Sequence, residues 1–140
     1  MAEDFNAKMH RAIDAWNTDN ADLLDEAYAA DILYHMPPFP DLVGTAAQKQ
    51  FIATFRAAFP DFQVTMDEDF VEGNRSLHRW HAQGTFSGQS SMLPVPPTDK
   101  PSTASGALVM HWQNGMVTEA WHFGDWLGWL QGAGVLPPLT

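Results

Sequence analysis

Hydrophobic positions in the first part of the chain recur at helical spacing. Between residues 5 and 16 they lie three or four positions apart and form one apolar stripe, made of Phe5, Met9, Ala12, Ile13 and Trp16. This period predicts an N-terminal helix. The same period predicts a short helix over 23–28 and a longer one over 45–59 that ends at Pro60. Thr45 and Gln48 have the spacing of a capping box at the start of that helix.

From residue 62 onward the pattern changes to alternation, which predicts strands. Four long strands are expected, over 62–72, 75–86, 103–113 and 116–123, after a first strand over 31–36 (DILYHM). Asn114-Gly115 is a strong signal for a two-residue hairpin. A proline-rich loop at 93–101 separates the two hairpins, and a short Trp/Leu-rich helix is expected from Trp126 to Gln131.

Helices, then an antiparallel meander, then one helix predict an α+β fold, with helices on one face of a curved, mostly antiparallel sheet. Such a sheet encloses an interior whose lining is set by strand parity. We expect one domain over residues 1–140. The side chains expected to point inward are Trp16, His35, Trp80, His111, Trp121 and Phe123.

Composition narrows the possible partners. The chain has 140 residues, of which 45% are hydrophobic and 17% charged, as in folded globular proteins. The formal net charge of −10 disfavours nucleic acids and anionic membranes as partners. There is no cysteine, which excludes disulfides and a thiolate nucleophile. The N-terminus does not look like a secretory signal, so we expect a cytoplasmic protein.

Asp125 is the leading catalytic candidate. It follows the last strand among Trp121, Phe123, Trp126 and Trp129. A carboxylate buried in apolar surroundings either finds hydrogen-bond donors or keeps a proton, and both outcomes suit an acid–base residue. The alternative is structural: Asp125 can cap the last helix by accepting the amide hydrogen of Leu127 or Gly128. The two roles do not exclude each other.

His111 is the second candidate, because a histidine near its ordinary pKa can shuttle protons. A two-residue turn pairs 113 with 116 and therefore places 111 opposite 118. The side chains of His111 and Asp125 would then meet only if the sheet curves into a closed cone. A structural role for His111 is the alternative.

Metal and cofactor motifs are not found. His78 and His81 are three apart on a strand, which places them on opposite faces, and His122 shares a face with neither Trp121 nor Phe123. There is no HExxH, GxSxG, Walker or GxGxxG motif. We therefore expect no metal and no cofactor.

Several short segments, in this order, together resemble the SnoaL-like polyketide cyclase / ester cyclase family of the nuclear transport factor 2-like superfamily. They are Phe59-Pro60-Asp61-Phe62, Arg79-Trp80, Gly84-Thr85, Pro96-Pro97-Thr98 with Lys100, Asn114-Gly115, Glu119, Trp121, Asp125, Leu127-Gly128 and Gly134-Val135-Leu136-Pro137. The chain departs from the pattern at Phe86, where many members have histidine, and at Thr98-Asp99-Lys100, where glycine commonly precedes the lysine.

The resemblance implies a cone-shaped α+β barrel with a deep apolar pocket, assembled as a homodimer or tetramer. It implies an intramolecular aldol condensation that closes a ring of an aromatic polyketide ester without metal or cofactor. The residue matching Asp125 is the general acid/base in this family, and a histidine matching His111 lies nearby.

Three functions remain open from the sequence. The first is a cyclase-type lyase or isomerase acting on a small hydrophobic or aromatic carbonyl compound. Its catalytic residues would be Asp125 and His111, and its substrate-binding residues Trp16, His35, Trp80, Trp121 and Phe123. The second is a non-catalytic protein that binds a small hydrophobic ligand. The third is an epoxide-opening hydrolase with an Asp–Arg–Asp arrangement, for which Arg79 is the only tempting arginine.

Overall fold

The computed structural model describes residues 4–139 and has an α+β fold. The helical elements are α1 (Phe5–Ala12), α2 (Asp14–Asn17), the 3-10 helix η1 (Ala21–Glu26), α3 (Thr45–Ala58) and α4 (Trp126–Gly132). The strands are β1 (Tyr28–His35), β2 (Leu42–Val43), β3 (Gln63–Glu72), β4 (Arg75–Thr85), β5 (Pro101–Gln113) and β6 (Met116–Gly124).

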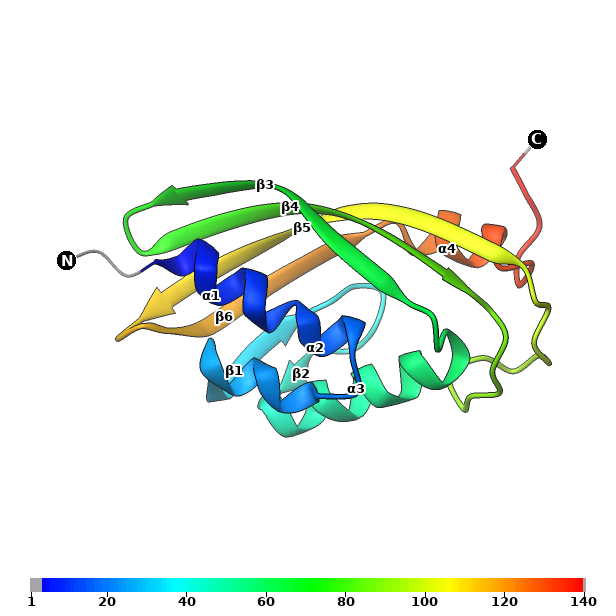
Figure 1. The fold of residues 1–140 in the computed structure, drawn as a ribbon, viewed down its shortest axis with the longest axis horizontal. Helices are drawn as coiled ribbons and strands as arrows, with labels where there is room; N and C mark the ends of the chain where they lie inside the picture. Colours follow the sequence, from blue (N-terminus) through cyan, green and yellow to red (C-terminus); the bar gives the residue numbers. More distant parts are fainter. Residues whose placement is uncertain (1–3, 140) are drawn as a thin grey trace.

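The six strands form one sheet in the order β2-β1-β6-β5-β4-β3. β1 runs parallel to β6, and the other neighbouring pairs are antiparallel. Figure 1 shows the long strands β3 to β6 as a curved sheet, with α1, α2 and α3 on one side of it and α4 at one end. The predicted fold class is therefore confirmed, although the sheet is open and helices complete the enclosure.

The helices differ from their predicted bounds at their ends. The N-terminal apolar stripe is split at Ile13 into α1 and α2, and Tyr28 belongs to β1 and not to a helix. Asp4 caps α1, because its side chain accepts a hydrogen bond from the Ala7 amide. The capping-box prediction for α3 is wrong. The helix begins at Thr45 directly after Gly44, whose φ is 89°, and no side chain caps it.

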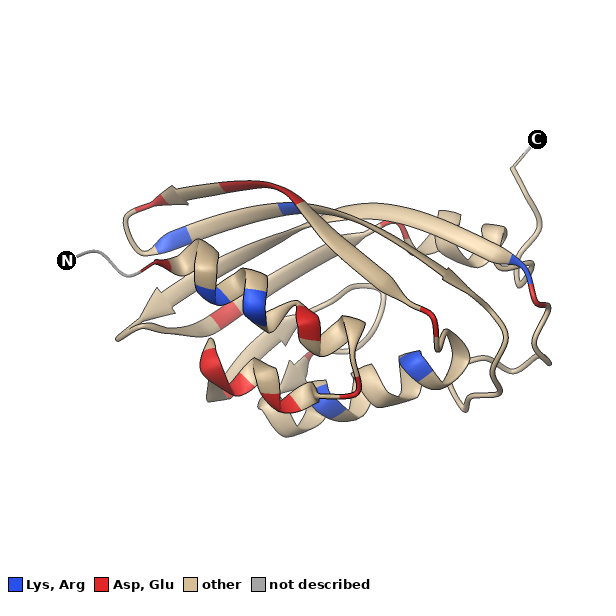
Figure 2. Ribbon diagram, in the orientation of Figure 1, with Lys and Arg blue, Asp and Glu red and all other residues tan. Residues whose placement is uncertain are grey.

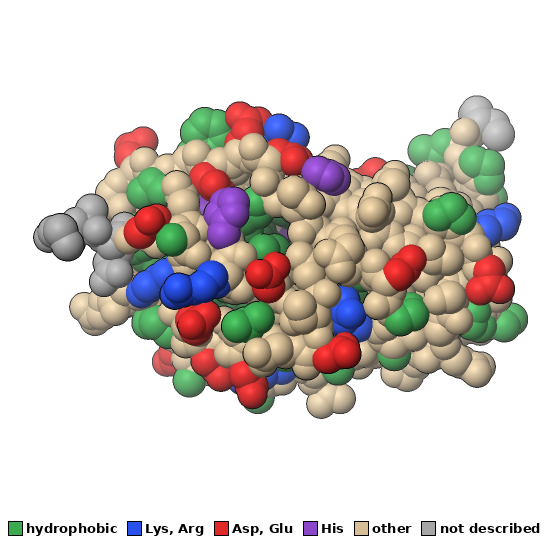
Figure 3. All heavy atoms as spheres, in the orientation of Figure 1, with side chains coloured by type: hydrophobic (Ala, Val, Ile, Leu, Met, Phe, Trp, Pro, Cys, Tyr) green, Lys and Arg blue, Asp and Glu red, His purple; other side chains and the backbone are tan. Residues whose placement is uncertain are grey.

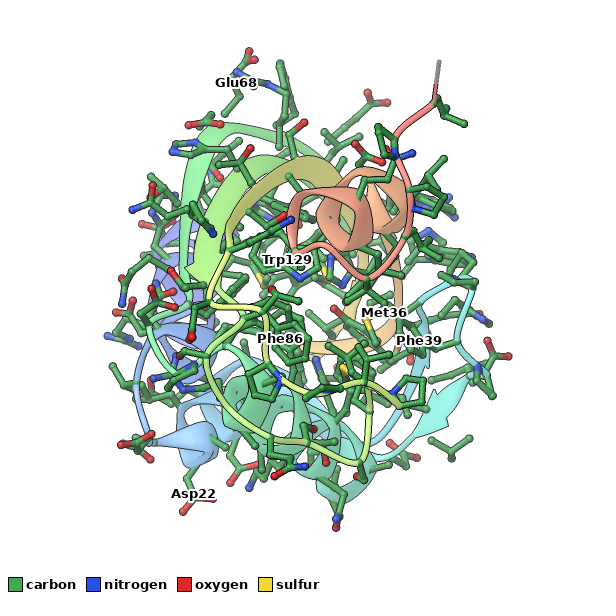
Figure 4. The ribbon with its side chains drawn as sticks, turned by 90° about the vertical axis from the view of Figure 1, so that its right-hand side faces the viewer. Asp22, Met36, Phe39, Glu68, Phe86 and Trp129 are labelled. Carbon is green, nitrogen blue, oxygen red and sulfur yellow. The ribbon has the colours of Figure 1, made fainter. Side chains whose placement is uncertain are left out.

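Alternating side chains of the sheet face the helices and form the core. In β4 every second residue from Ser76 to Gly84 is buried, and the residues between them up to Gln83 are exposed. Figure 4 looks at one end of the molecule, where Trp129, Phe86 and Met36 lie around the interior on three separate parts of the chain. All three are almost completely buried. Burial of each such side chain contributes roughly 1.5–3 kcal/mol, and the burial of Trp129 holds α4 against the core.

A β-bulge in β6 changes the register of the last hairpin. Next to the turn, Gln113 pairs with Met116 and Trp112 with Val117, but His111 pairs with Glu119. The predicted pairing of 111 with 118 is wrong because β6 contains one extra residue at this point. Beyond the bulge, even-numbered residues of both strands share a face, as in the pair of Leu108 and His122.

Charged residues lie mainly on the surface. Figure 2 shows acidic residues on η1 and on β3, and Lys49 of α3 forms ion pairs with Asp22 and Asp25 of η1 at 2.9 and 2.8 Å. In Figure 3 basic side chains stand in small separate groups among acidic and apolar ones. Within residues 4–139, no helix has the length and hydropathy needed to cross a membrane.

Candidate functional site

An aromatic cavity lies between the sheet and the helices. Its walls include Trp16 of α2, Phe55 of α3, Phe62, Trp80 of β4, and Trp126 and Trp129 of α4. The cavity and its mouth together contain about 530 Å³ of space that is free of atoms. Within this space, the centre of a water molecule can reach a volume of only about 40 Å³. The cavity is therefore narrow, and a ligand larger than a few water molecules requires side chains or α4 to move.

Two polar side chains form a buried pair in this cavity. The Tyr34 hydroxyl lies 3.1 Å from Nδ1 of His122, and the two residues are 1% and 9% exposed. Burial, with a smaller effect of Tyr28, raises the pKa of Tyr34 well above its ordinary value. Burial also lowers the pKa of His122 to about 4. Both side chains are therefore neutral near pH 7.

Neighbouring rings hold His122 in place. The edges of Trp80 and Trp16 meet its ring, with centroid distances of 5.3 and 6.2 Å and interplanar angles of 73° and 82°. Its Nε2 lies 3.7 Å from the point that a Cβ on Gly124 would occupy, and Gly124 also lines the cavity. Nε2 therefore lies beside Gly124, where the Trp80 indole is the neighbouring side chain.

Asp125 lies at the mouth of the cavity, immediately after β6. It caps α4, because its Oδ1 accepts a hydrogen bond of 2.8 Å from the Gly128 amide. A Cβ on residue 128 would lie 2.2 Å from Oδ2, so glycine is required for this geometry. The capping interpretation is confirmed. The burial suggested by the surrounding aromatic residues is not observed, because Asp125 is exposed.

Four of the predicted site residues lie on the other face of the sheet. His35 and His111 pack against Trp121, with centroid distances of 5.1 and 4.7 Å, and Phe123 is 51% exposed. The inward orientation expected for these four is wrong. The bulge turns Trp121 and Phe123 outward, while His35 and His111 are odd-numbered residues on strands whose even-numbered residues face inward. The cavity therefore brings together Trp16, Trp80 and Asp125 only.

His35 belongs to an ionic group on that outer face. Its Nε2 lies 2.8 Å from Glu119 Oε2, and its Nδ1 lies 2.9 Å from Asp41 Oδ1. The hydrogen bond to Glu119, supported by Asp41 and opposed by partial burial, raises the pKa of His35. The group can hold a positive charge at a pH where His122 is neutral.

Tyr34 and His122 are the residues that the sequence did not identify as a site. His122 lies between two aromatic residues, and a simple two-residue hairpin places it on the outer face. Only the bulge brings it inside. The signal that could have found Tyr34 was the alternation of DILYHM, in which Ile32, Tyr34 and Met36 are all buried.

The remaining polar residues of the sheet form local networks outside the cavity. His78 is buried and contacts Ser76 and Asp69, both at 2.8 Å, whereas His81 is exposed and contacts Asp67. Their predicted opposite orientation is confirmed. Arg79 pairs with Glu68 at 2.7 Å on the surface. Within residues 4–139, no three histidine, aspartate or glutamate side chains gather in a way that could hold a metal ion.

The cavity lining is rich in hydrogen-bond donors. The indole nitrogens of Trp80, Trp126 and Trp129 are buried and have no hydrogen-bond partner within the described chain. Leaving a buried donor unpaired costs roughly 1–3 kcal/mol. Among the side chains that line the cavity, only the carboxylate of Asp125 is purely an acceptor.

Comparisons with known proteins show the family of the chain. The family model of the SnoaL-like polyketide cyclases matches residues 7–132. No curated protein sequence matches the chain significantly. Three similar solved structures come from Jannaschia sp. CCS1, Streptomyces antibioticus and Streptomyces galilaeus.

The Jannaschia protein, assigned as a SnoaL-like polyketide cyclase, has 21% identity and a TM-score of 0.83, covering 97% of this chain and 95% of that one. IdmH of Streptomyces antibioticus, assigned as a polyketide cyclase, has 23% identity and a TM-score of 0.80, covering 94% and 99%. AclR of Streptomyces galilaeus, assigned as a hydroxylase, has 20% identity and a TM-score of 0.82, covering 97% and 84%.

At these identities the structural likeness shows the fold, and a structure described as ketosteroid isomerase-like, from Catenulispora acidiphila, shares it with a TM-score of 0.75. The family model covers nearly the whole chain, from α1 to the end of α4. The chain belongs to the SnoaL-like polyketide cyclase family.

Proposed function

We propose that the protein is a cofactor-independent acid–base enzyme that acts on a small hydrophobic carbonyl compound in this cavity. The reaction is an intramolecular aldol condensation that closes a ring, or a related isomerisation. One observation carries the proposal: an aromatic cavity has a carboxylate at its mouth and a neutral imidazole in its wall. Family membership supports the same chemistry.

Asp125 is the acid/base in this proposal. Its carboxylate removes a proton from a carbon between two carbonyl groups, and the electron pair of the C–H bond passes into an enolate. The enolate carbon attacks the second carbonyl of the same molecule, and the new alkoxide takes the proton back from Asp125. No proton is consumed overall. The apolar walls hold the two reacting carbons together, which supplies much of the rate.

His122 replaces His111 as the assisting histidine. His111 packs on Trp121 at the outer face of the sheet and cannot contact a ligand in the cavity. His122 lines the same cavity as Asp125 and presents Nε2 to it. The substrate-binding side chains in the proposal are those of Trp16, Trp80 and Trp129.

The test compares the wild type with Asp125→Asn. A panel of β-keto esters and polycyclic aromatic ketones is first screened for thermal stabilisation, and each hit is then incubated and analysed for product by chromatography. The proposal expects conversion by the wild type and a loss of at least a hundredfold in Asp125→Asn, with binding retained. Asparagine keeps the cap of α4, so the comparison isolates the proton transfer.

The second candidate is a binding protein without catalysis. The capping role of Asp125 and its exposure favour it, because an exposed carboxylate held by the Gly128 amide needs no catalytic explanation. Its expected result is equal stabilisation of both proteins by a hit that neither converts.

A further inference from the structure

We propose that Tyr34 holds His122 as the tautomer with hydrogen on Nε2, so that His122 donates a hydrogen bond to an acceptor oxygen of the bound compound. The recognised group is a carbonyl oxygen that becomes an enolate oxygen during the reaction. This inference deepens the proposed function, on which its catalytic part rests. It makes His122 a donor to the substrate and Tyr34 a positioning residue.

The tautomer follows from the hydrogen-bond partners of Tyr34. Its hydroxyl is buried, and its one partner among the described residues is Nδ1 of His122. Burial keeps this hydroxyl protonated, since it raises the pKa of Tyr34. If Nδ1 carried the imidazole hydrogen, the hydroxyl hydrogen would have no acceptor. A buried donor left in that state is costly, so the hydroxyl donates to Nδ1 and Nε2 carries the hydrogen.

The geometry directs Nε2 toward a ligand. Among the described residues no group forms a hydrogen bond with Nε2, which lies beside Gly124 and the carbon edge of the Trp80 indole, and neither of these accepts its hydrogen. Trp80 and Trp16 hold the ring by edge contacts, which leaves little freedom for it to turn. A compound that enters between these two indoles therefore meets a fixed N–H donor.

The other polar atoms of the cavity point to the same kind of ligand. Three indole N–H groups of the lining side chains, from Trp80, Trp126 and Trp129, lack an acceptor. Among the side chains that line the cavity, Asp125 at the mouth is the only pure acceptor. The three indole nitrogens are inaccessible in the cavity as it stands, so Nε2 of His122 is the N–H group that a carbonyl oxygen of a flat apolar compound can reach.

The same donor stabilises the reaction intermediate. Hydrogen bonds to charged oxygens are roughly twice as strong as those to neutral ones, so the bond from Nε2 strengthens as the carbonyl becomes an enolate. Because the imidazole is neutral, it can assist without transferring its own proton. Asp125 and His122 thus have separate tasks, the first moving the proton and the second holding the oxygen.

The tautomer can be measured in the free protein. Long-range ¹⁵N–¹H correlation spectra of protein labelled with ¹⁵N-histidine at pH 7 report which nitrogen of each ring carries hydrogen. The expected spectrum of His122 shows a protonated Nε2 and an unprotonated Nδ1, and Tyr34→Phe shifts the ring toward the other tautomer. A protonated Nδ1 in the wild type would overturn the inference without reference to any activity.

The donor role can be measured by binding. 1-Indanone and indane are matched bicyclic probes that differ in one carbonyl oxygen. The wild type is expected to bind 1-indanone about tenfold more tightly, which is the value of one ordinary hydrogen bond. His122→Gln places an amide N–H near Nε2 and keeps the preference, whereas His122→Leu removes it. Equal affinity of the wild type for both probes contradicts the inference.

These experiments separate the two proposals. If the Nε2 tautomer and the carbonyl preference are found while no compound is converted, the enzyme proposal fails and the recognition of an acceptor oxygen stands. If compounds are converted but the tautomer is reversed, the enzyme proposal stands and the role given to Tyr34 and His122 is wrong.

Discussion

Gly106 and Gly124 face each other across β5 and β6, and the indole of Trp80 lies over both of them. Because neither glycine has a side chain, the Trp80 indole lies directly against the two strands and forms one wall of the cavity. A Cβ on Gly106 would lie 2.5 Å from Trp80 Cζ2 and 2.2 Å from the Phe123 carbonyl oxygen. A Cβ on Gly124 would lie 3.1 Å from the same Cζ2.

The glycine pair gives a prediction about stability. We expect Gly106→Ala to lower the free energy of unfolding by about 3 kcal/mol, because the new methyl group meets backbone, and Gly124→Ala to lower it by about 1 kcal/mol, because the indole can shift slightly. Urea denaturation measures both. Equal effects of the two substitutions would contradict the close backbone contact described at Gly106.

Asp125 gives a prediction that separates capping from chemistry. Asp125→Ala removes the acceptor for the Gly128 amide and should lower the free energy of unfolding by about 1 kcal/mol. Asp125→Asn keeps a capping side chain and should unfold within about 0.5 kcal/mol of the wild type. Thermal unfolding followed by tryptophan fluorescence gives the comparison. If the asparagine variant is as destabilised as the alanine variant, the hydrogen bond alone does not account for the cap, and the negative charge of Asp125 also stabilises α4.

Burial of His122 predicts a pH dependence of stability. Burial lowers the pKa of His122 to about 4 in the folded protein, whereas the unfolded value is about 6.5. Between these values the unfolded chain binds the extra proton, so stability rises with pH across this window and falls on acidification. The full effect of His122 is about 3 kcal/mol.

Urea denaturation at several pH values between 4.5 and 7.5 tests this dependence, with His122→Gln as the control. The control should lose most of the slope. It keeps the smaller contribution of His78, whose pKa burial also lowers. An unchanged slope in the control would show that another group titrates in this range.

His35 predicts the opposite behaviour on the outer face. Its hydrogen bond to Glu119 raises its pKa, so the stability it contributes is present below about 6.5 and is lost as pH rises through the folded pKa. Proton NMR titration of the histidine rings should place the pKa of His35 above that of His122. Glu119→Gln should bring it back toward the ordinary value, and no change on this substitution would contradict the assignment.

The outer face also bears on assembly. Phe70, Leu77 and Phe123 are exposed there at 56%, 37% and 51%. We propose that the protein forms a homodimer through this face, which buries apolar surface that otherwise meets water. Light scattering should give twice the mass of the chain at micromolar concentration, and Phe123→Glu should give the monomer. A monomeric wild type would contradict the proposal.

Much of the fold could be predicted from the sequence because the periods are local signals. The alternation of β4, the Asn114-Gly115 turn and the stripe of α3 each determine one element. The cap of α4 was also readable, since Asp125 and Gly128 have capping spacing. The break at Ile13 was not, because no glycine or proline marks it.

The site was harder to predict because it depends on one irregularity. The bulge lies at residues 117–119, which are Val117, Thr118 and Glu119. Each of these side chains can occupy either face of a strand, so the sequence gives no signal of a bulge. One extra residue nevertheless decides whether Trp121 or His122 faces the interior. Because side chains alternate along a strand, the undetected bulge reversed the orientation expected for every residue after it. The orientations expected for Trp121, His122 and Phe123 were therefore wrong.

The cap formed by Asp125 has a consequence for the timing of the proposed reaction. In the proposed reaction, the carboxylate that would take the substrate proton is the same one that accepts the hydrogen bond of the Gly128 amide. A protonated carboxyl is a weaker acceptor, so each such proton transfer would weaken the cap of α4, the helix that carries Trp126 and Trp129. Return of the proton tightens it again. The wall of the cavity would therefore loosen while the intermediate exists and tighten again once the carboxylate is restored.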